Sequence, residues 1–219
     1  SCMQETSSSI KSISILLVGM FTTACGIAMV TQAQLGTTPI STVPLVAAAI
    51  SGLSFGTTTF LVNAVFVLIQ KLIFGRHFNP INWLQIPLAF AFGLFLDVGM
   101  HFAEFMKSED YLWQLALNMG GNAVLGLGII LEIRSKSIVL PGEGLVMALA
   151  YFFRKPFPKM KIINDVTLVC LAAVIGWLCL STFVGIGQGT LISAICVGFF
   201  VKCWHMIFSA FNLSEKEQG

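Results

Sequence analysis

Six apolar stretches, each long enough to cross a lipid bilayer as a helix, constrain the fold of this chain more than any other feature. They cover residues 13–31, 56–74, 82–102, 113–133, 163–180 and 190–209. A transmembrane α-helix needs about 20 apolar residues to cross the hydrocarbon core. Charged residues make up 10% of the chain, whereas a soluble domain carries roughly 25%. The sequence therefore predicts an all-α, polytopic membrane protein of about six transmembrane helices.

Two further apolar segments, 39–50 and 141–153, are too short to span a bilayer. Each begins at a proline, Pro39 or Pro141, and proline suits the first turn of a helix because its missing N–H would have no partner there. Apolar segments of about 10 to 14 residues are typical of re-entrant or buried helices. We expect two re-entrant half-helices whose N-termini point toward the membrane midplane. If both segments cross fully instead, the number of spans becomes eight.

An internal repeat relates the two halves of the chain. A shift of 102 residues, increased by three near the end of each unit, superposes these pairs: Gly19 and Gly121, Pro39 and Pro141, Ser41 and Glu143, Asn63 and Asp165, Gly93 and Gly198, and Asp97 and Lys202. Each unit holds three spans and one half-helix. Because three is odd, the second unit must enter the membrane upside down. Inverted repeats with broken helices are the architecture of many secondary transporters.

The domain boundaries follow from this repeat. We expect a disordered tail at 1–10, repeat 1 at 11–105, an external loop at 106–112, repeat 2 at 113–210 and a C-terminal cytoplasmic tail at 211–219. A signal peptide is a second interpretation of 13–31, but this stretch is longer than a usual signal core and has an internal copy. With a cytoplasmic N-terminus, Lys107 is the one basic residue outside. The excess of Lys and Arg inside predicts that both termini are cytoplasmic.

Several short motifs carry a family resemblance. They are Ala-Gln-Leu-Gly-Thr-Thr-Pro at 33–39, Leu-Ser-Phe-Gly-Thr at 53–57, Gly-Leu-Phe-Leu-Asp at 93–97, Pro-Gly-Glu-Gly-Leu at 141–145 and Gly-Ile-Gly-Gln-Gly-Thr at 185–190. Over most of residues 13–209 this pattern resembles the YczE/YyaS/YitT group of bacterial integral membrane proteins. Glu143 stands where members often have Asp, and Gln188 and Gly189 stand where they have a bare Gly-Thr. The resemblance implies a bacterial cytoplasmic (inner) membrane protein, with a transport or export role suspected, and supplies no substrate.

Charged side chains within the apolar segments are the first candidates for function, because each is costly to place in a bilayer. Glu143, Asp165 and Glu132 belong to the second repeat, and their first-repeat counterparts are uncharged. Burial raises the pKa of a carboxyl group toward neutrality, so we expect proton or cation coupling through these three residues. Other interpretations are a helix cap for Glu143, an interfacial position for Asp165 and a salt bridge between Glu132 and Arg134.

Polar residues near the predicted half-helix starts complete a predicted substrate site. The set is Thr37, Thr38, Ser41, Thr42, Asn63, Gly142, Glu143 and Gln188. Asp97 and Lys202 coincide in the repeat but lie at different depths, so we expect separate gate or anchor charges rather than an ion pair. Snorkelling of Lys202 to the interface is the simpler alternative. The glycines of 120–128 favour close helix packing.

These features favour a secondary carrier, with proton coupling as an option, for a small polar or charged solute. A small-solute channel and a non-transporting membrane partner of a biosynthetic or signalling complex are the alternatives. The chain carries no nucleophile elbow, phosphate loop or metal-binding cluster, so we expect no enzyme, no cofactor and no metal. The expected partners are the lipid bilayer and a small-molecule substrate, without nucleic acid. A homodimer is left open.

Overall fold

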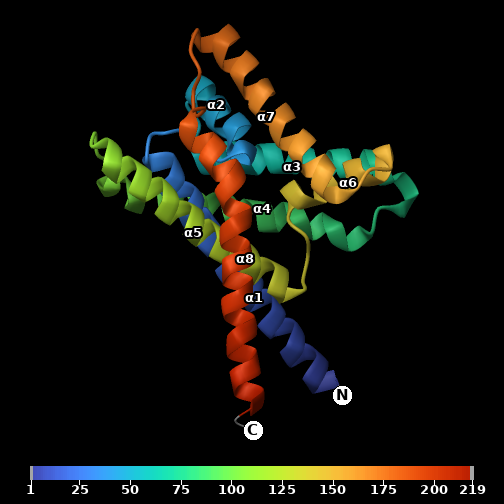
Figure 1. Ribbon diagram of the computed structural model, residues 1–219. Coiled ribbons are helices and arrows are strands. Elements are labelled where there is room, and N and C mark those ends of the chain that lie inside the picture. Colours follow the sequence, from blue (N-terminus) through green and yellow to red (C-terminus); the bar gives the residue numbers. More distant parts are fainter. Residues whose placement is uncertain (1, 218–219) are drawn as a thin grey trace.

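The computed structural model describes the backbone of residues 2–217 and the side chains of residues 8–212. Every regular element in this part of the chain is a helix (Figure 1). The elements are α1 (Cys2–Gln32), η1 (Pro39–Ser41), α2 (Thr42–Ser51), α3 (Phe55–Phe74), η2 (Gly75–His77), η3 (Pro80–Leu84), α4 (Gln85–Ala103), η4 (Glu104–Met106), α5 (Tyr111–Ser135), α6 (Pro141–Phe153), α7 (Phe157–Leu180) and α8 (Gln188–Glu217).

Six helical segments of the described chain are long and apolar enough to cross a membrane. They are Ser8–Gln32, Phe55–His77, Pro80–Met106, Tyr111–Ser135, Phe157–Leu180 and Gln188–Asn212. Each contains one of the predicted apolar stretches, so the prediction of a polytopic, all-α membrane protein is confirmed. The two shorter apolar helices, Pro39–Ser51 and Pro141–Phe153, begin at the predicted prolines.

The N-terminal end of the chain differs from the predicted disordered tail at 1–10, because α1 already begins at Cys2. The predicted C-terminal tail at 211–219 is helical as far as Glu217, where α8 ends, and its cytoplasmic location stays a prediction. Residues 1, 218 and 219 lie outside the described chain. Neither 2–10 nor 211–217 contains the helix breakers proline and glycine, so nothing in these segments stops the adjoining helix.

Helices α1 and α5 form the centre of the molecule, and they pack antiparallel with their backbones in close contact. A Cβ atom built on Gly26 would lie 2.5 Å from the amide nitrogen of Leu125, and one built on Gly128 would lie 2.4 Å from that of Thr23. Half of the apolar, membrane-spanning stretch of α1 is buried inside the protein, whereas 6% of the equivalent stretch of α8 is buried. The predicted packing role of the α5 glycines is therefore confirmed at Gly128.

The two halves of the molecule pair their helices in a similar way, with one exception. Helix α1 packs against α4 as α5 packs against α8, and α3 packs against α6 as α2 packs against α7. Helix α3 also packs along α4, whereas α7 and α8 form no packed pair among the described residues. Figure 1 shows α7 and α8 diverging from the loop that joins them. The first half is therefore closed by the contact between α3 and α4, whereas the second half is open between α7 and α8.

The closed seam between α3 and α4 depends on two glycines and one carboxylate. A Cβ atom built on Gly93 would lie 2.5 Å from the carbonyl oxygen of Gly56. The Asp97 carboxylate accepts hydrogen bonds from the amide of Gly56 and the hydroxyl of Ser54, each at 2.7 Å. Asp97 thus anchors the first turn of α3, where a negative charge also suits the helix dipole. By contrast, a Cβ atom on Gly198, the repeat partner of Gly93, would meet no atom within 4 Å.

This difference predicts opposite effects for the same substitution at the two glycines. Gly93→Ala forces backbone apart at the α3–α4 seam and is expected to cost about 1–3 kcal/mol of stability. Gly198→Ala adds a methyl group in open space and removes the flexibility of a helical glycine, so it should leave the stability unchanged or raise it by about 0.5–1 kcal/mol. Thermal unfolding of both detergent-purified variants checks this. Equal melting temperatures for the two variants would contradict the conclusion that the α3–α4 seam is tightly packed and that the space between α7 and α8 is open.

Candidate functional site: a cavity between the two short helices

A cavity of about 400 Å³ lies where the two short helices begin. Its wall includes Pro39 and Ile40 of η1 and Pro141 and Gly142 of α6. A Cβ atom built on Gly142 would lie 2.3 Å from the Cδ1 atom of Ile40, so the two helix starts are in contact. Neither start has a side-chain cap. The predicted meeting of the two starts at one cavity is therefore found.

Of the four predicted hydroxyl groups, those of Thr38 and Ser41 belong to the cavity wall, whereas those of Thr37 and Thr42 do not. Thr38 and Ser41 line it, and the Thr38 hydroxyl donates to the Ser41 hydroxyl at 3.0 Å. Thr42 is fully buried, and its hydroxyl donates to the carbonyl of Pro39 at 2.7 Å. The Thr42 side chain therefore closes the turn from η1 into α2 and is not part of the cavity wall.

A pair of buried amides supports the start of α6. The Gln70 amide donates to Gln85 Oε1 at 3.1 Å, and Gln85 Nε2 donates back to Gln70 Oε1 at 3.1 Å. Gln70 Nε2 also lies 3.4 Å from the carbonyl oxygen of Pro141. Both glutamines are at most 2% exposed. A Cβ atom on Gly144 would lie 2.6 Å from Gln70 Nε2, so only glycine lets α6 rest on this pair.

The three predicted carboxylates meet at the cavity. Glu132 accepts a hydrogen bond from the Thr23 hydroxyl at 2.8 Å. Asp165 pairs with Lys161 over 3.4 Å. Glu143 is exposed toward the cavity and lies close enough to Glu132 and Lys161 for their charges to interact. Lys161 is the one basic side chain among the described residues of the wall.

The alternative of a salt bridge between Glu132 and Arg134 is not found. The guanidinium of Arg134 lies over the ring of Phe208, 5.0 Å from its centroid, while Glu132 is bonded to Thr23 across the α1–α5 interface. The two residues are two positions apart on α5 and therefore point in different directions. The direction of its side chain therefore allows Glu132 to line the cavity.

Three buried polar side chains of the wall escaped the sequence prediction. Thr59, Asn164 and Ser193 are 5%, 6% and 1% exposed, and Thr59 Oγ1, Asn164 Nδ2 and Ser193 Oγ have no hydrogen-bond partner among the described residues. Buried polar groups are nearly always paired with protein or water. These atoms are therefore free to bind a solute or water in the cavity. Thr59 corresponds to Lys161 in the repeat, and the sequence prediction included neither residue.

The repeat relates the two halves of the cavity wall residue by residue. Every wall residue from the first half has a wall residue 102 positions later, or 105 positions later in α4. Asn63, for example, corresponds to Asp165, and Phe92 corresponds to Val197. The wall residues without a first-half counterpart are Glu132, Asn164, Ser193, Gly198 and Val201. The opposed orientation of the two repeats in a membrane stays a prediction.

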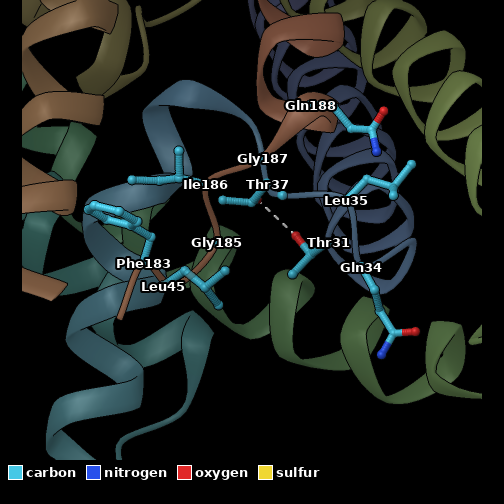
Figure 2. A pocket seen from close by; sticks show the side chains of 11 residues that line it. Thr31, Gln34, Leu35, Thr37, Leu45, Phe183, Gly185, Ile186, Gly187 and Gln188 are labelled. Carbon is cyan, nitrogen blue, oxygen red and sulfur yellow. Dashed lines mark hydrogen bonds between the residues drawn. The ribbon is translucent and has the colours of Figure 1, made fainter. Parts of the chain in front are cut away.

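Two predicted substrate residues lie outside this cavity, in a second pocket of about 400 Å³ (Figure 2). Thr37 donates its amide to the carbonyl of Gly185 at 2.8 Å, and its hydroxyl lies 2.9 Å from that of Thr31. Gln188 accepts a hydrogen bond from the Tyr111 hydroxyl at 2.7 Å. The amide of Gly189 donates to the Leu35 carbonyl at 2.7 Å, so two backbone hydrogen bonds join the loop 33–38 to the loop 181–187 and the start of α8.

The two predicted gate or anchor charges are far apart in the fold. Asp97 holds the start of α3. Lys202 is exposed on α8 and has no hydrogen bond or ion pair with any described residue. The one ion pair in the described chain is that of Lys161 and Asp165. As expected, Asp97 and Lys202 form no pair.

A comparison with protein families gives one match. Residues 10–206 match a family described as a family of unknown function, DUF6198. The chain belongs to this family. No curated protein and no solved structure matches. Membership in DUF6198 brings no substrate with it, and the resemblance to the YczE/YyaS/YitT group stays a prediction.

The amide pair beneath α6 can be tested by a double-mutant cycle. Gln70→Leu or Gln85→Leu alone leaves one buried amide without its partner, which costs about 1–3 kcal/mol. The double variant leaves neither amide behind, so it should recover a large part of that loss. Thermal unfolding of the purified variants measures the coupling. Strictly additive losses would show that the two amides do not act as a pair.

Proposed function

We propose that this protein is a secondary carrier that binds a small polar or charged solute in the cavity between η1 and α6. The observation that supports the proposal most strongly is the chemistry of the wall. It combines Glu132, Glu143 and Asp165 with three buried polar atoms that have no hydrogen-bond partner in the described part of the chain. Such atoms are costly to bury unless water or a ligand satisfies them. Broken helices in a membrane protein are tolerated where they line a wet cavity.

A barrier on one side of the cavity favours a carrier over a channel. Thr38 lines the cavity and Thr37 lines the second pocket, so the segment that contains them separates the two spaces. The hydrogen bonds of Thr37 to Gly185 and of Gly189 to Leu35 hold this segment in place. A carrier needs such a barrier because its site opens to one side at a time, whereas a conducting channel is continuous.

Coupling to protons or another cation is part of this proposal. A carboxylate in an apolar wall can hold either a proton or a bound cation, so Glu132, Glu143 and Asp165 can link solute movement to an ion gradient. The proposed location is a bacterial cytoplasmic membrane with both termini on the cytoplasmic side. The distribution of Lys and Arg supports this orientation, and Figure 1 places the N- and C-termini at the same end of the molecule.

The test combines a ligand screen with transport in vesicles. Purified protein is screened against metabolites and drugs by thermal shift, and each hit is followed into proteoliposomes with and without a pH gradient. We expect saturable uptake that is lost in Gly198→Trp, because Gly198 lines the cavity, a Cβ atom there meets no atom within 4 Å, and a bulky side chain is expected to occupy part of the cavity. Glu143→Gln with Asp165→Asn should remove the response to the pH gradient.

The control is Glu109→Gln, the same chemical change at an exposed loop position. It should transport like the parent protein. Unchanged uptake in Gly198→Trp would refute the cavity as the transport site. Flux that never saturates would favour a channel, and binding without flux would favour the non-transporting membrane partner.

A further inference from the structure

The polar and apolar parts of the cavity wall are separated along its length. On α5, Leu125, Ile129 and Glu132 follow one another at helical spacing and line the same wall. At 1.5 Å per residue, Leu125 lies about 10 Å along the helix from Glu132. On the antiparallel α1, Thr23 bonds Glu132, and Ile27 lies one turn farther toward the Leu125 end. The cavity therefore has an acidic end and an apolar end.

The apolar end is built from four helices. Besides Ile27 and Leu125, it includes Ala89 and Phe92 of α4 and Val197 of α8. No charged side chain of α1, α4 or α8 reaches the wall within the described chain. This part of the wall offers a solute van der Waals contact and removal from water, and it offers few hydrogen bonds. A sugar or another fully polar solute would leave its hydroxyl groups unpaired there.

The acidic end has more negative than positive groups. Lys161 forms an ion pair with Asp165, while Glu132 accepts only the neutral Thr23 hydroxyl in the described chain. The exposed side chain of Glu143 forms no hydrogen bond with any described residue. An anion would be repelled by these carboxylates, whereas a cation would be attracted with little screening by water.

The buried polar atoms that have no partner among the described residues give independent support for a ligand. The hydroxyl oxygens of Thr59 and Ser193 can accept an N–H, and Asn164 Nδ2 can donate to an oxygen of a solute or of a water bound with it. Asn164 directly precedes Asp165 on α7, and Thr59 lies one helical turn before Asn63 on α3. Thr59 and Asn164 therefore lie beside other polar residues of the wall, whereas Ser193 is the one polar wall residue on α8 within the described chain.

We propose that the cavity binds an amphipathic organic cation, with its onium group between Glu132, Glu143 and Asp165 and its apolar body against α1, α4, α5 and α8. This inference names the substrate class of the carrier site and rests on the proposed function. With one lysine beside three carboxylates among its described residues, the ionised wall keeps an excess of negative charge, which favours a cation over an anion. The described side chains of the apolar end offer no oxygen ligands to a small hydrated metal ion, whereas they suit the apolar body of an organic cation.

Two ions of the same shape and opposite charge test this proposal. Tetraphenylphosphonium and tetraphenylborate differ in charge and hardly in size or apolarity, and a smaller pair, benzyltrimethylammonium and benzylsulfonate, serves if the tetraphenyl ions do not fit. Equilibrium dialysis with purified protein in a neutral detergent measures binding. We expect the cation of a pair to bind at least about tenfold more tightly than the anion, because the carboxylates attract one and repel the other.

The variants assign this binding to the cavity. Glu143→Gln should weaken cation binding about tenfold or more, and its side chain has no packing role that would disturb the fold. Glu109→Gln should bind like the parent protein, and Gly198→Trp should bind neither ion. The inference is overturned if the anion binds as tightly as the cation, if neither cation binds, or if cation binding survives in Gly198→Trp.

The proposed function fails by a different result. Cation binding that depends on Glu143 and is blocked in Gly198→Trp, without movement of the cation across proteoliposomes, would leave the substrate class standing and refute transport. Saturable uptake of an anion that is lost in Gly198→Trp would support transport through the cavity and refute the cation as its substrate class.

Discussion

The backbone groups at the start of each short helix need hydrogen-bond partners within the protein, because the lipid supplies no water to them. The rest of the structure depends on which groups serve as these partners. Before η1, the loop 33–38 is hydrogen-bonded through Thr37 to the loop 181–187 and through Leu35 to Gly189 at the start of α8. At the start of α6, the Gln70 amide reaches the carbonyl of Pro141. Both helix starts are thereby held at the centre of the molecule, and the space between them is the cavity.

The elements of the fold were predictable from the sequence, whereas their association was not. Apolar length predicts the six spans, and Pro39 and Pro141 predict where the short helices begin, because both signals are local. The open seam between α7 and α8 depends on contacts between residues far apart in the chain. Gly93 and Gly198 are equivalent in the repeat, and only the structure shows that one is tightly packed and the other free.

The sequence predicted those residues of the candidate site that carry a carboxylate or have a carboxylate counterpart in the repeat. Glu132, Glu143, Asp165 and Asn63 were singled out and line the cavity. Thr37 and Thr42 are close in sequence to residues that do line it, but one step along a chain turns a side chain to another face. Gln188 was selected because it departs from the family pattern, which carries no information on the direction of its side chain. Ser193 was missed because a lone serine in an apolar helix is common and carries no signal of what it faces.

All three carboxylates of the cavity come from the second half of the chain, and the equivalent positions of the first half hold Val30, Ser41 and Asn63. The two halves otherwise contribute matching positions to the wall, so charge is what distinguishes the two faces of the cavity. A copy inserted the other way round would present its acidic face to the opposite compartment. Dual topology would therefore produce two populations of one molecule whose acidic faces point to opposite compartments.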